Sequence, residues 1–264
     1  MTHVLGLDIG GSGIKGAIVD TEKGELVSDR IRLETPQPAT PEAVVETAAE
    51  VVRQIGWTDA DGPIGAGFPA VVRNGHVLTA ANIDKGWIGQ PLDRLLNDAT
   101  GCACYGINDA DAAGLAEMRF GIGRGQKGVV FMLTFGTGIG SAVFTDGVLV
   151  PNTELGHIIF HGNIAEKYAA ASARDREDLK WVKWGKRVSE YLQELERLFW
   201  PNLFLIGGGA SKKFHKWAEG LEVKTPVKAA ELLNLAGIIG AGMWAYERHR
   251  AVVESPAEVA VAGD

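Results

Sequence analysis

The sequence has very few cysteines, and this scarcity excludes a disulfide framework. Cys102 and Cys104 are the only two among 264 residues. Proteins that depend on disulfides carry more cysteines and belong to oxidising compartments, so the pair favours a reducing one. The first residues, Met1 to Asp8, contain no basic leader followed by a long apolar stretch. We therefore expect a cytoplasmic protein whose two cysteines are small residues of a strand.

Long apolar runs and an excess of positive charge are also absent. No run of about 18 apolar residues occurs, and a membrane-spanning helix needs roughly that length. The chain has 26 Lys and Arg against 33 Asp and Glu, a formal net charge of −7. Such a balance argues against non-specific binding to nucleic acid or to an anionic membrane. We therefore expect no nucleic-acid or membrane partner.

Glycine, by contrast, is abundant, and it gathers in blocks. There are 35 glycines among 264 residues, about twice the usual share of roughly 7%. Three blocks, Gly10–Gly16, Gly136–Gly140 and Gly207–Gly209, each follow an apolar run that predicts a strand. Glycine lets the backbone approach another group closely or adopt a positive φ. Three such turns favour a nucleotide or polyanion held by main-chain N–H groups.

The hydrophobic pattern alternates between strand and helix periods, which is typical of an α/β protein. The expected strands are 3–9, 14–20, 25–33, 64–68, 103–107, 129–134 and 203–206, with hairpins at 71–78 and 141–150. The expected helices are 41–55, 91–100, 109–120, 163–173, 184–199 and 235–246.

One arrangement occurs twice along the chain. A strand, a glycine turn and a hairpin follow one another at 4–33 and again at 129–150. This repeat predicts two lobes built on one plan, with a central cleft between them. We expect an N-terminal lobe of 1–108 with helix 235–246 packed back on it, a C-terminal lobe of 109–234 and a loose tail of 251–264.

The first glycine block resembles a dinucleotide-binding fingerprint but does not satisfy it. Gly11-Ser12-Gly13-Ile14-Lys15-Gly16 has the spacing G-x-G-x-x-G, yet a hairpin follows where the fingerprint requires a helix. What remains is Asp8 at a strand end, which suits a hydrated Mg²⁺ ion. Ser12, Lys15 and the backbone N–H groups suit phosphate oxygens. A tight hairpin with a surface lysine is the alternative reading of these residues.

Acidic and amide residues form a second group of candidates. Asn108, Asp109 and Asp111 lie at an expected strand-to-helix junction, where helix capping explains one such residue but not three. A carboxylate placed there could act as general base toward a hydroxyl. Glu154 and His157 follow the second hairpin, and Asn82 adds an amide; such groups commonly bind sugar hydroxyls. A structural role for His157 is the alternative.

Together these motifs resemble the ROK family of sugar kinases and repressors. The matching segments, in the family's order, are Leu-Asp-Ile-Gly-Gly-Ser-Gly-Ile-Lys15, Asn108-Asp109-Ala, Leu-Thr-Phe-Gly-Thr-Gly-Ile-Gly140, Glu154-Leu-Gly-His157 and Leu-Ile-Gly-Gly-Gly-Ala210. Within the family the resemblance is strongest to polyphosphate glucokinases, including polyphosphate/ATP glucomannokinases. It rests on Thr-Pro-Gln-Pro-Ala-Thr-Pro41, Ala-Ala-Asn-Ile-Asp-Lys-Gly-Trp-Ile88 and Asn-Asp-Ala-Asp-Ala-Ala-Gly-Leu-Ala-Glu117.

The resemblance implies an actin-like ATPase fold, of the ribonuclease H-like class. It implies a kinase that transfers a phosphoryl group from polyphosphate, with ATP as a possible second donor, to O6 of glucose with Mg²⁺, as a homodimer. Asp109 would be the general base, and the sugar contacts would be Asn82, Asn108, Asp109, Glu154, His157 and Glu166. The phosphate contacts would be Asp8, Gly10, Gly11, Ser12, Gly13, Lys15, Thr137, Gly138, Gly208 and Gly209, with Asp8 holding Mg²⁺ through water.

Two features bear on the metal and the phosphate donor. Relatives with structural zinc carry three cysteines between the His157 and Glu166 positions, whereas this chain has none, so we expect no zinc. Residues 174–216 contain ten basic and six acidic side chains, a net charge of +4 on a chain of −7. We expect this basic strip, with Lys183, Lys186 and Arg187, to bind polyphosphate; an ordinary solvated helix face is the alternative.

Two other functions remain compatible with the residues. One is an ATP-dependent ROK glucokinase or glucomannokinase, since the glycine turns would hold the phosphates of ATP equally well. The other is a sugar-sensing ROK protein without catalytic activity. Asp109 and Lys15 argue against the sensor, because binding alone needs neither a general base nor a cation at the phosphate turn.

Overall fold

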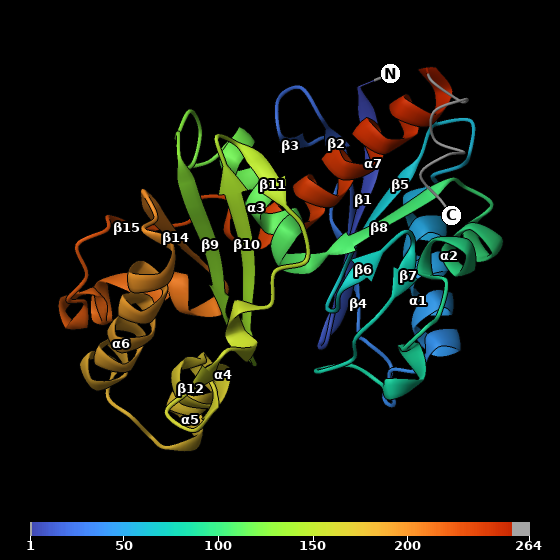
Figure 1. Cartoon of the computed structure of the whole chain (residues 1–264). Helices are drawn as coiled ribbons and strands as arrows, with labels where there is room; N and C mark the ends of the chain where they lie inside the picture. Colours follow the sequence, from blue (N-terminus) through green and yellow to red (C-terminus); the bar gives the residue numbers. More distant parts are fainter. Residues whose placement is uncertain (1, 255–264) are drawn as a thin grey trace. The chain divides into compact units, whose positions relative to one another are not determined.

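The computed structural model describes residues 2–254 and divides the chain into two compact units. Unit 1 comprises Met1–Ala116 and Leu235–Asp264, and unit 2 comprises Glu117–Asn234 (Figure 1). The division therefore falls inside helix α3, Asp109–Arg119, rather than at its first residue, where the sequence prediction put it. No helix among residues 2–254 is long and apolar enough to cross a membrane.

The sheet of unit 1 has the strand order β3-β2-β1-β5-β8, with β4 also paired to β2. The bounds are β1 His3–Gly10, β2 Gly13–Asp20, β3 Glu25–Leu26, β4 Ile31–Leu33, β5 Ile64–Phe68 and β8 Cys104–Asn108. Strand β1 is antiparallel to β2 and parallel to β5, which is in turn parallel to β8. A small hairpin, β6 Val72–Arg73 with β7 His76–Val77, stands apart from this sheet.

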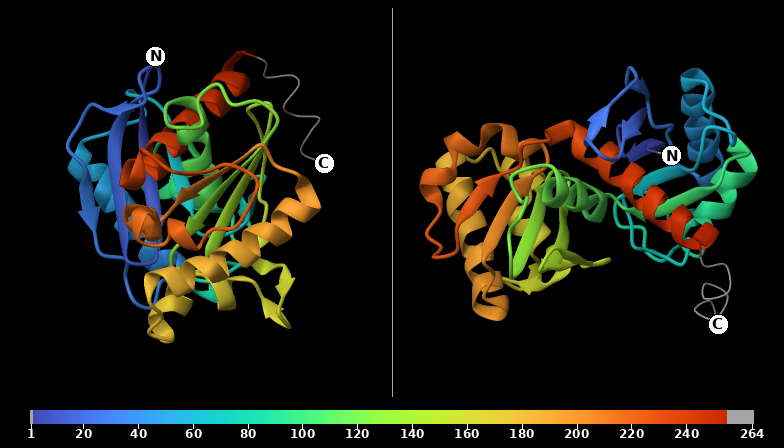
Figure 2. Two further views of the ribbon diagram at one scale, coloured as in Figure 1. Left: turned by 90° about the vertical axis from the view of Figure 1, so that its left-hand side faces the viewer. Right: turned by 90° about the horizontal axis from the view of Figure 1, so that it is seen from above.

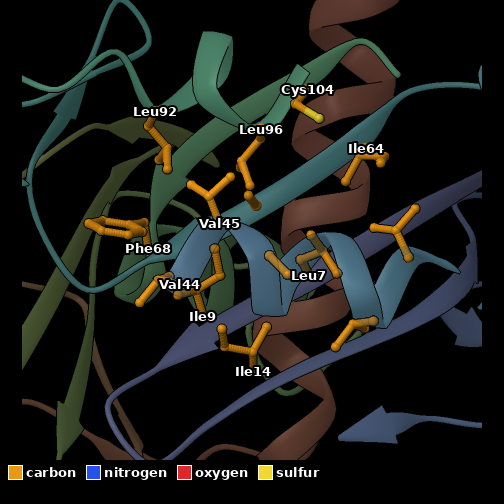
Figure 3. Packing of buried hydrophobic residues seen from close by; sticks show 14 of the residues in the cluster. Leu7, Ile9, Ile14, Val44, Val45, Ile64, Phe68, Leu92, Leu96 and Cys104 are labelled. Atoms are coloured by element: carbon orange, nitrogen blue, oxygen red, sulfur yellow. The ribbon is translucent and has the colours of Figure 1, made fainter. Parts of the chain in front are cut away.

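Helices α1, Pro41–Ile55, and α2, Leu92–Thr100, cover one face of this sheet. Helix α1 begins where predicted: the Thr40 hydroxyl accepts a hydrogen bond from the backbone N–H of Ala43 at 3.4 Å, and Pro41 occupies the first turn. Gly56 ends the helix in the left-handed conformation. Figure 3 shows Val44 and Val45 in one apolar cluster with the strand residues Leu7 and Ile9.

Helix α7, Ala236–Glu254, packs against β1 and β5 of the same sheet. The approach is close enough to require glycine. A Cβ on Gly6 would lie 2.1 Å from the Ile238 carbonyl oxygen, and one on Gly65 would lie 1.8 Å from that of Ala241. Side chains alternate across a strand, so Gly6 faces α7 while Leu5 and Leu7 belong to the apolar cluster that includes α1.

Unit 2 repeats the same sheet plan, with strand order β11-β10-β9-β14-β15. The bounds are β9 Val129–Phe135, β10 Ile139–Thr145, β11 Val148–Val150, β14 Leu203–Gly207 and β15 Val227–Ala229. As in unit 1, a central strand is antiparallel to the strand after it and parallel to a later one. Helix α6, Trp181–Phe199, lies across one face of this sheet (Figure 2). Its Trp184 ring packs edge-on against Phe135 of β9 at 5.9 Å between centroids.

Several predicted elements differ from the structure. The expected strand 25–33 is two short strands, β3 and β4, and the expected helix 163–173 is wrong. That segment forms β13, Asn163–Ile164, paired with β12, Ile159–Phe160, followed by α4, Glu166–Ala169, and α5, Ala171–Arg176. Ala170 separates the two helices with extended backbone. Helix α7 extends to Glu254, so residues 251–254 of the expected loose tail are helical; 255–264 lie outside the described residues.

Candidate active site

In unit 1 a row of charged side chains crosses three neighbouring strands. Asp8 of β1 is paired in register with Lys15 of β2, and Lys15 is paired with Arg32 of β4. The Lys15 ammonium donates to the Asp8 carboxylate at 2.7 Å, and about a fifth of each side chain is exposed. The structure thus brings together the two predicted residues, and it adds Arg32. The pairing of β4 with β2, which places Arg32 there, was not apparent from the sequence.

The turn between β1 and β2 lies beside this row. The Arg32 guanidinium donates to the Ser12 carbonyl oxygen at 2.9 Å, and a Cβ on Gly13 would come within 2.8 Å of that guanidinium. The Thr35 hydroxyl donates to the Gly10 carbonyl oxygen at 2.5 Å. These bonds occupy carbonyl groups of the turn and place two cations at its edge. Gly11 has open space around it, which suits the approach of a phosphate.

Residues Asn108 and Asp109 lie where β8 meets α3, at the carboxyl end of the parallel strands β1, β5 and β8. The Asn108 side-chain oxygen accepts from the N–H groups of Ala110 and Asp111 at 2.9 and 3.1 Å, so it caps the helix. Its amide nitrogen donates to the Ala70 carbonyl oxygen at 3.1 Å. Asp109 is half-buried in the first turn of α3, where the helix dipole favours a carboxylate.

Asn82, the remaining predicted sugar contact of unit 1, is exposed in the loop after the β6–β7 hairpin. Unit 1 therefore holds Asp8, Lys15, Asn108 and Asp109 at the carboxyl ends of adjacent strands or beside them. In open α/β sheets this edge is where ligands bind.

In unit 2 three predicted sugar contacts come together around one imidazole. His157 Nδ1 lies 3.2 Å from the Glu154 carboxylate, and its Nε2 lies 3.9 Å from that of Glu166. Glu166, the first residue of α4, is 6% exposed, and its carboxylate also accepts from the Ile139 N–H at 3.3 Å. Burial raises the pKa of Glu154, and the neighbouring His157 partly opposes this shift. The group presents hydrogen-bond acceptors on either side of a ring that can donate or accept.

Tight packing fixes the backbone that carries Glu154 and His157. A Cβ on Gly156 would lie 2.2 Å from the Ile139 carbonyl oxygen, so this position accommodates only glycine. The Ser141 hydroxyl donates to the Thr153 carbonyl oxygen at 2.7 Å and accepts from the Leu155 N–H at 3.0 Å. The short helix η2, Leu155–His157, is thereby held against the start of β10.

The two glycine turns of unit 2 follow the paired strands β9 and β14. Gly208 has φ +74°, and a Cβ there would lie 2.7 Å from the Phe135 carbonyl oxygen, directly before the Gly136–Gly138 turn. The Ser172 hydroxyl donates to the Thr137 carbonyl oxygen at 2.6 Å, so α5 supports that turn. Open space surrounds Gly136 and Gly209. The two turns of unit 2 that are predicted to contact phosphate are therefore neighbours.

The predicted residues of the basic strip differ in their surroundings. Lys183 and Lys186 are exposed on α6, but Arg187 is engaged by its own unit. Its guanidinium donates to the Glu177 carboxylate at 2.5 Å and stacks 4.6 Å above the Tyr168 ring centroid. Arg187 therefore ties α6 to α4 and to the end of α5. Its contact with polyphosphate stays a prediction. Exposed lysines of the following helix η3, Gly209–Lys216, extend the strip, namely Lys212, Lys213 and Lys216.

Few side chains of the described residues are placed to hold a metal ion. No group of three or more His, Cys, Asp or Glu side chains in the described part of the chain could hold a metal ion. Magnesium needs less, because it keeps several waters and binds through one or two carboxylates and substrate phosphates. Asp8 fits this requirement: it is partly exposed beside a phosphate-type turn, and its second oxygen faces Gly237, whose missing side chain leaves room.

Two units that repeat one five-strand order, with glycine turns and carboxylates after the strands, define an actin-like ATPase fold. The model of the ROK family matches residues 4–174, and the chain belongs to this family. It is 52% identical over 242 residues to a polyphosphate glucokinase of Mycobacterium tuberculosis, covering 91% of this chain and 90% of the relative.

Solved structures of sugar kinases are also similar to this chain. An inorganic polyphosphate/ATP-glucomannokinase from Arthrobacter sp. strain KM superposes with a TM-score of 0.91 at 46% identity, covering 94% of this chain and all of that one. A ROK family glucokinase from Streptomyces griseus, in complex with glucose and AMPPNP, has a TM-score of 0.75 at 26% identity, covering 93% and 99%.

Proposed function

We propose that this protein is a polyphosphate-dependent glucokinase that forms glucose 6-phosphate. One observation carries the proposal: the chain shares half its residues with a polyphosphate glucokinase over nine-tenths of both sequences. The charged row at the β1–β2 turn and the Glu154–His157–Glu166 group support it, since they supply the cations and acceptors that a phosphate donor and a sugar require.

Asp109 acts as the general base in this proposal. It removes the proton from the 6-hydroxyl while O6 forms a bond to the terminal phosphorus of the donor. The bond between that phosphorus and its bridging oxygen breaks, and the donor leaves one phosphate shorter. Asn82, Glu154, His157 and Glu166 hold the other hydroxyls, whereas Asn108 contributes chiefly by capping α3 and fixing Asp109. Positioning and charge stabilisation supply most of the catalysis in phosphoryl transfer.

Lys15 and Arg32 neutralise charge on the reacting phosphate at the β1–β2 turn. The N–H groups of the turns at Ser12, Thr137 and Gly209 bind other phosphate oxygens. Asp8 would hold Mg²⁺ through water, and such an ion would supply further neutralisation of the donor. Lys15 keeps the Asp8 carboxylate in place through their 2.7 Å bond.

The deciding experiment measures glucose 6-phosphate formation with polyphosphate and with ATP as separate donors. We expect turnover with polyphosphate. Turnover with ATP alone would make the protein an ATP-dependent glucokinase of the same family. Binding of glucose without product from either donor would make it a sugar sensor.

Donor choice depends on the basic strip, and a double variant tests it. Lys183→Ala with Lys186→Ala removes charges that only a long phosphate chain would reach, so the KM for polyphosphate should rise on the order of tenfold. The KM for ATP should not change. The matched control, Lys127→Ala with Lys228→Ala, removes two exposed lysines elsewhere in unit 2. If the two double variants changed the KM for polyphosphate equally, the basic strip would be excluded as a polyphosphate-binding surface.

A further inference from the structure

The chain passes between the two units twice. The first passage lies at Ala116/Glu117 within α3, and the second at Asn234/Leu235 just before α7. In unit 1 the two segments touch: a Cβ on Gly240 of α7 would lie 1.7 Å from the Ala112 carbonyl oxygen of α3. The segments that join the units are therefore in contact on the unit 1 side.

On the unit 2 side a single carboxylate joins the same two segments. Glu117 is fully buried. One of its carboxylate oxygens accepts from the Leu232 N–H at 2.7 Å, and the other accepts from the Ile122 N–H at 3.3 Å. Glu117, the first residue of unit 2, thus binds the segment that leads to the second passage at Asn234/Leu235.

The surroundings fit a charged carboxylate closely. No ion pair to Glu117 is present among residues 2–254, and burial raises its pKa while the backbone donors lower it. A Cβ on Gly121 would lie 2.0 Å from a Glu117 oxygen, so the turn after α3 is closed around this side chain. Burying a carboxylate without a cation is costly, and an apolar residue would fill this site more simply if packing were its sole role.

The second passage also holds a backbone that leucine seldom adopts. Leu233, next to the Leu232 N–H that Glu117 binds, has φ +50°, and its side chain is 47% exposed. A left-handed backbone is unfavourable for such a residue. Neighbouring contacts must hold it, and the Glu117 hydrogen bond is the nearest of them along the chain.

We propose that Glu117 is a positioning residue of the kinase, tying the two connections between the units together. The inference rests on the proposed function in one respect. In the proposed function the candidate residues are divided between the units: Asp109 and Asp8 belong to unit 1, whereas Glu154, His157 and Glu166 belong to unit 2. Loosening the connections would then weaken sugar binding and slow phosphoryl transfer without removing any group that touches the substrate.

Glu117→Gln tests this role, because its NH₂ group would face a backbone N–H where an oxygen now accepts. Glu196→Gln is the matched control. Glu196 of α6 accepts from the Thr225 N–H at 2.5 Å and from its hydroxyl at 2.7 Å, within unit 2 and remote in sequence from both passages. Each variant loses a carboxylate that binds backbone N–H groups, and both should be destabilised.

Two measurements separate positioning from stability. Amide hydrogen exchange of 231–235 should accelerate on the order of tenfold in Glu117→Gln, whereas Glu196→Gln should affect 224–225 instead. The kcat/KM for glucose should fall on the order of tenfold in Glu117→Gln and stay within about twofold in Glu196→Gln. Unchanged exchange of 231–235, or equal kinetic losses in the two variants, would overturn the proposal.

Leu233→Gly provides a second test, which leaves the Glu117 side chain in place. Glycine adopts φ +50° without strain, so this variant should fold as stably as the natural chain. The extra freedom should raise the KM for glucose severalfold, whereas the control Asn74→Gly, at φ +50° in the β6–β7 turn, should not. If Leu233→Gly and the natural chain had equal KM values for glucose, the inference would be overturned. A wild-type protein without kinase activity would refute the proposed function, and the exchange measurement would still decide the role of Glu117.

Discussion

Asp93 should make the stability of unit 1 depend on pH in an unusual direction. This residue of α2 accepts a hydrogen bond from the Gly106 N–H of β8 at 2.7 Å. Its other oxygen lies beside Gly75, where a Cβ would come within 2.8 Å of it. Burial raises the pKa of Asp93 from 3.8 to about 6, and the Gly106 bond and the charge of His76 only partly oppose the shift.

The sign follows from proton linkage. The folded state binds the Asp93 proton more tightly than the unfolded state, so ionised Asp93 destabilises the fold above pH 6. This penalty disappears as the pH falls toward 3.8. A shift of roughly two pKa units corresponds to about 3 kcal/mol at most, of which about 2 kcal/mol would be recovered between pH 7.5 and pH 4.5. Partial solvent exposure reduces both figures.

Asp93→Asn removes the charge and keeps an oxygen that can accept from Gly106. Urea unfolding of the natural chain and of this variant at pH 7.5 and pH 4.5 gives the comparison. The difference in unfolding free energy between the variant and the natural chain should be more favourable to the variant at pH 7.5 than at pH 4.5, by at most about 2 kcal/mol. Asp98→Asn, an exposed position on the same helix, is the control and should show no such difference. A pH-independent effect of Asp93→Asn would refute the reasoning.

Three further predictions concern the kinase itself. Asp109→Ala should lower kcat at least roughly 100-fold while the fold survives; near-normal turnover with a native circular dichroism spectrum would remove Asp109 from the mechanism. Elemental analysis should find no stoichiometric zinc, and chelators should inhibit only until Mg²⁺ is restored; one zinc per chain would contradict this. Light scattering should show a homodimer, and a stable monomer at working concentration would contradict that prediction.

Local signals were sufficient for most strands and for the capped helices. The Thr40-Pro41 start and Gly56 end of α1 are properties of neighbouring residues, and the structure places both as predicted. The segment 163–173 was misassigned because its helical composition is interrupted by the extended backbone of Ala170. That conformation lets α5 support the Thr137 turn through Ser172, a contact between residues 35 positions apart.

The candidate site also contains residues that local sequence places and residues that only tertiary pairing places. Sequence could place Asp8 beside Lys15, and Glu154 beside His157, because each pair lies on one hairpin or one turn, where local geometry brings its members together. Arg32 was missed because its place beside Lys15 depends on the pairing of β4 with β2.

Sequence alone therefore determined the α/β class, the repeated plan of the two units and the residues of each glycine turn, since periodicity and turn chemistry act over a few residues. Tertiary structure decided which charges remain available. Arg187 reads as one more cation of the basic strip, yet Tyr168 of α4 and Glu177 at the end of α5 are its partners in the folded chain. Glu117 reads as the end of an acidic helix motif, yet its carboxylate meets Leu232, 115 residues away. Hydrogen bonds and ion pairs depend on distance in space, which a linear pattern of charges does not contain.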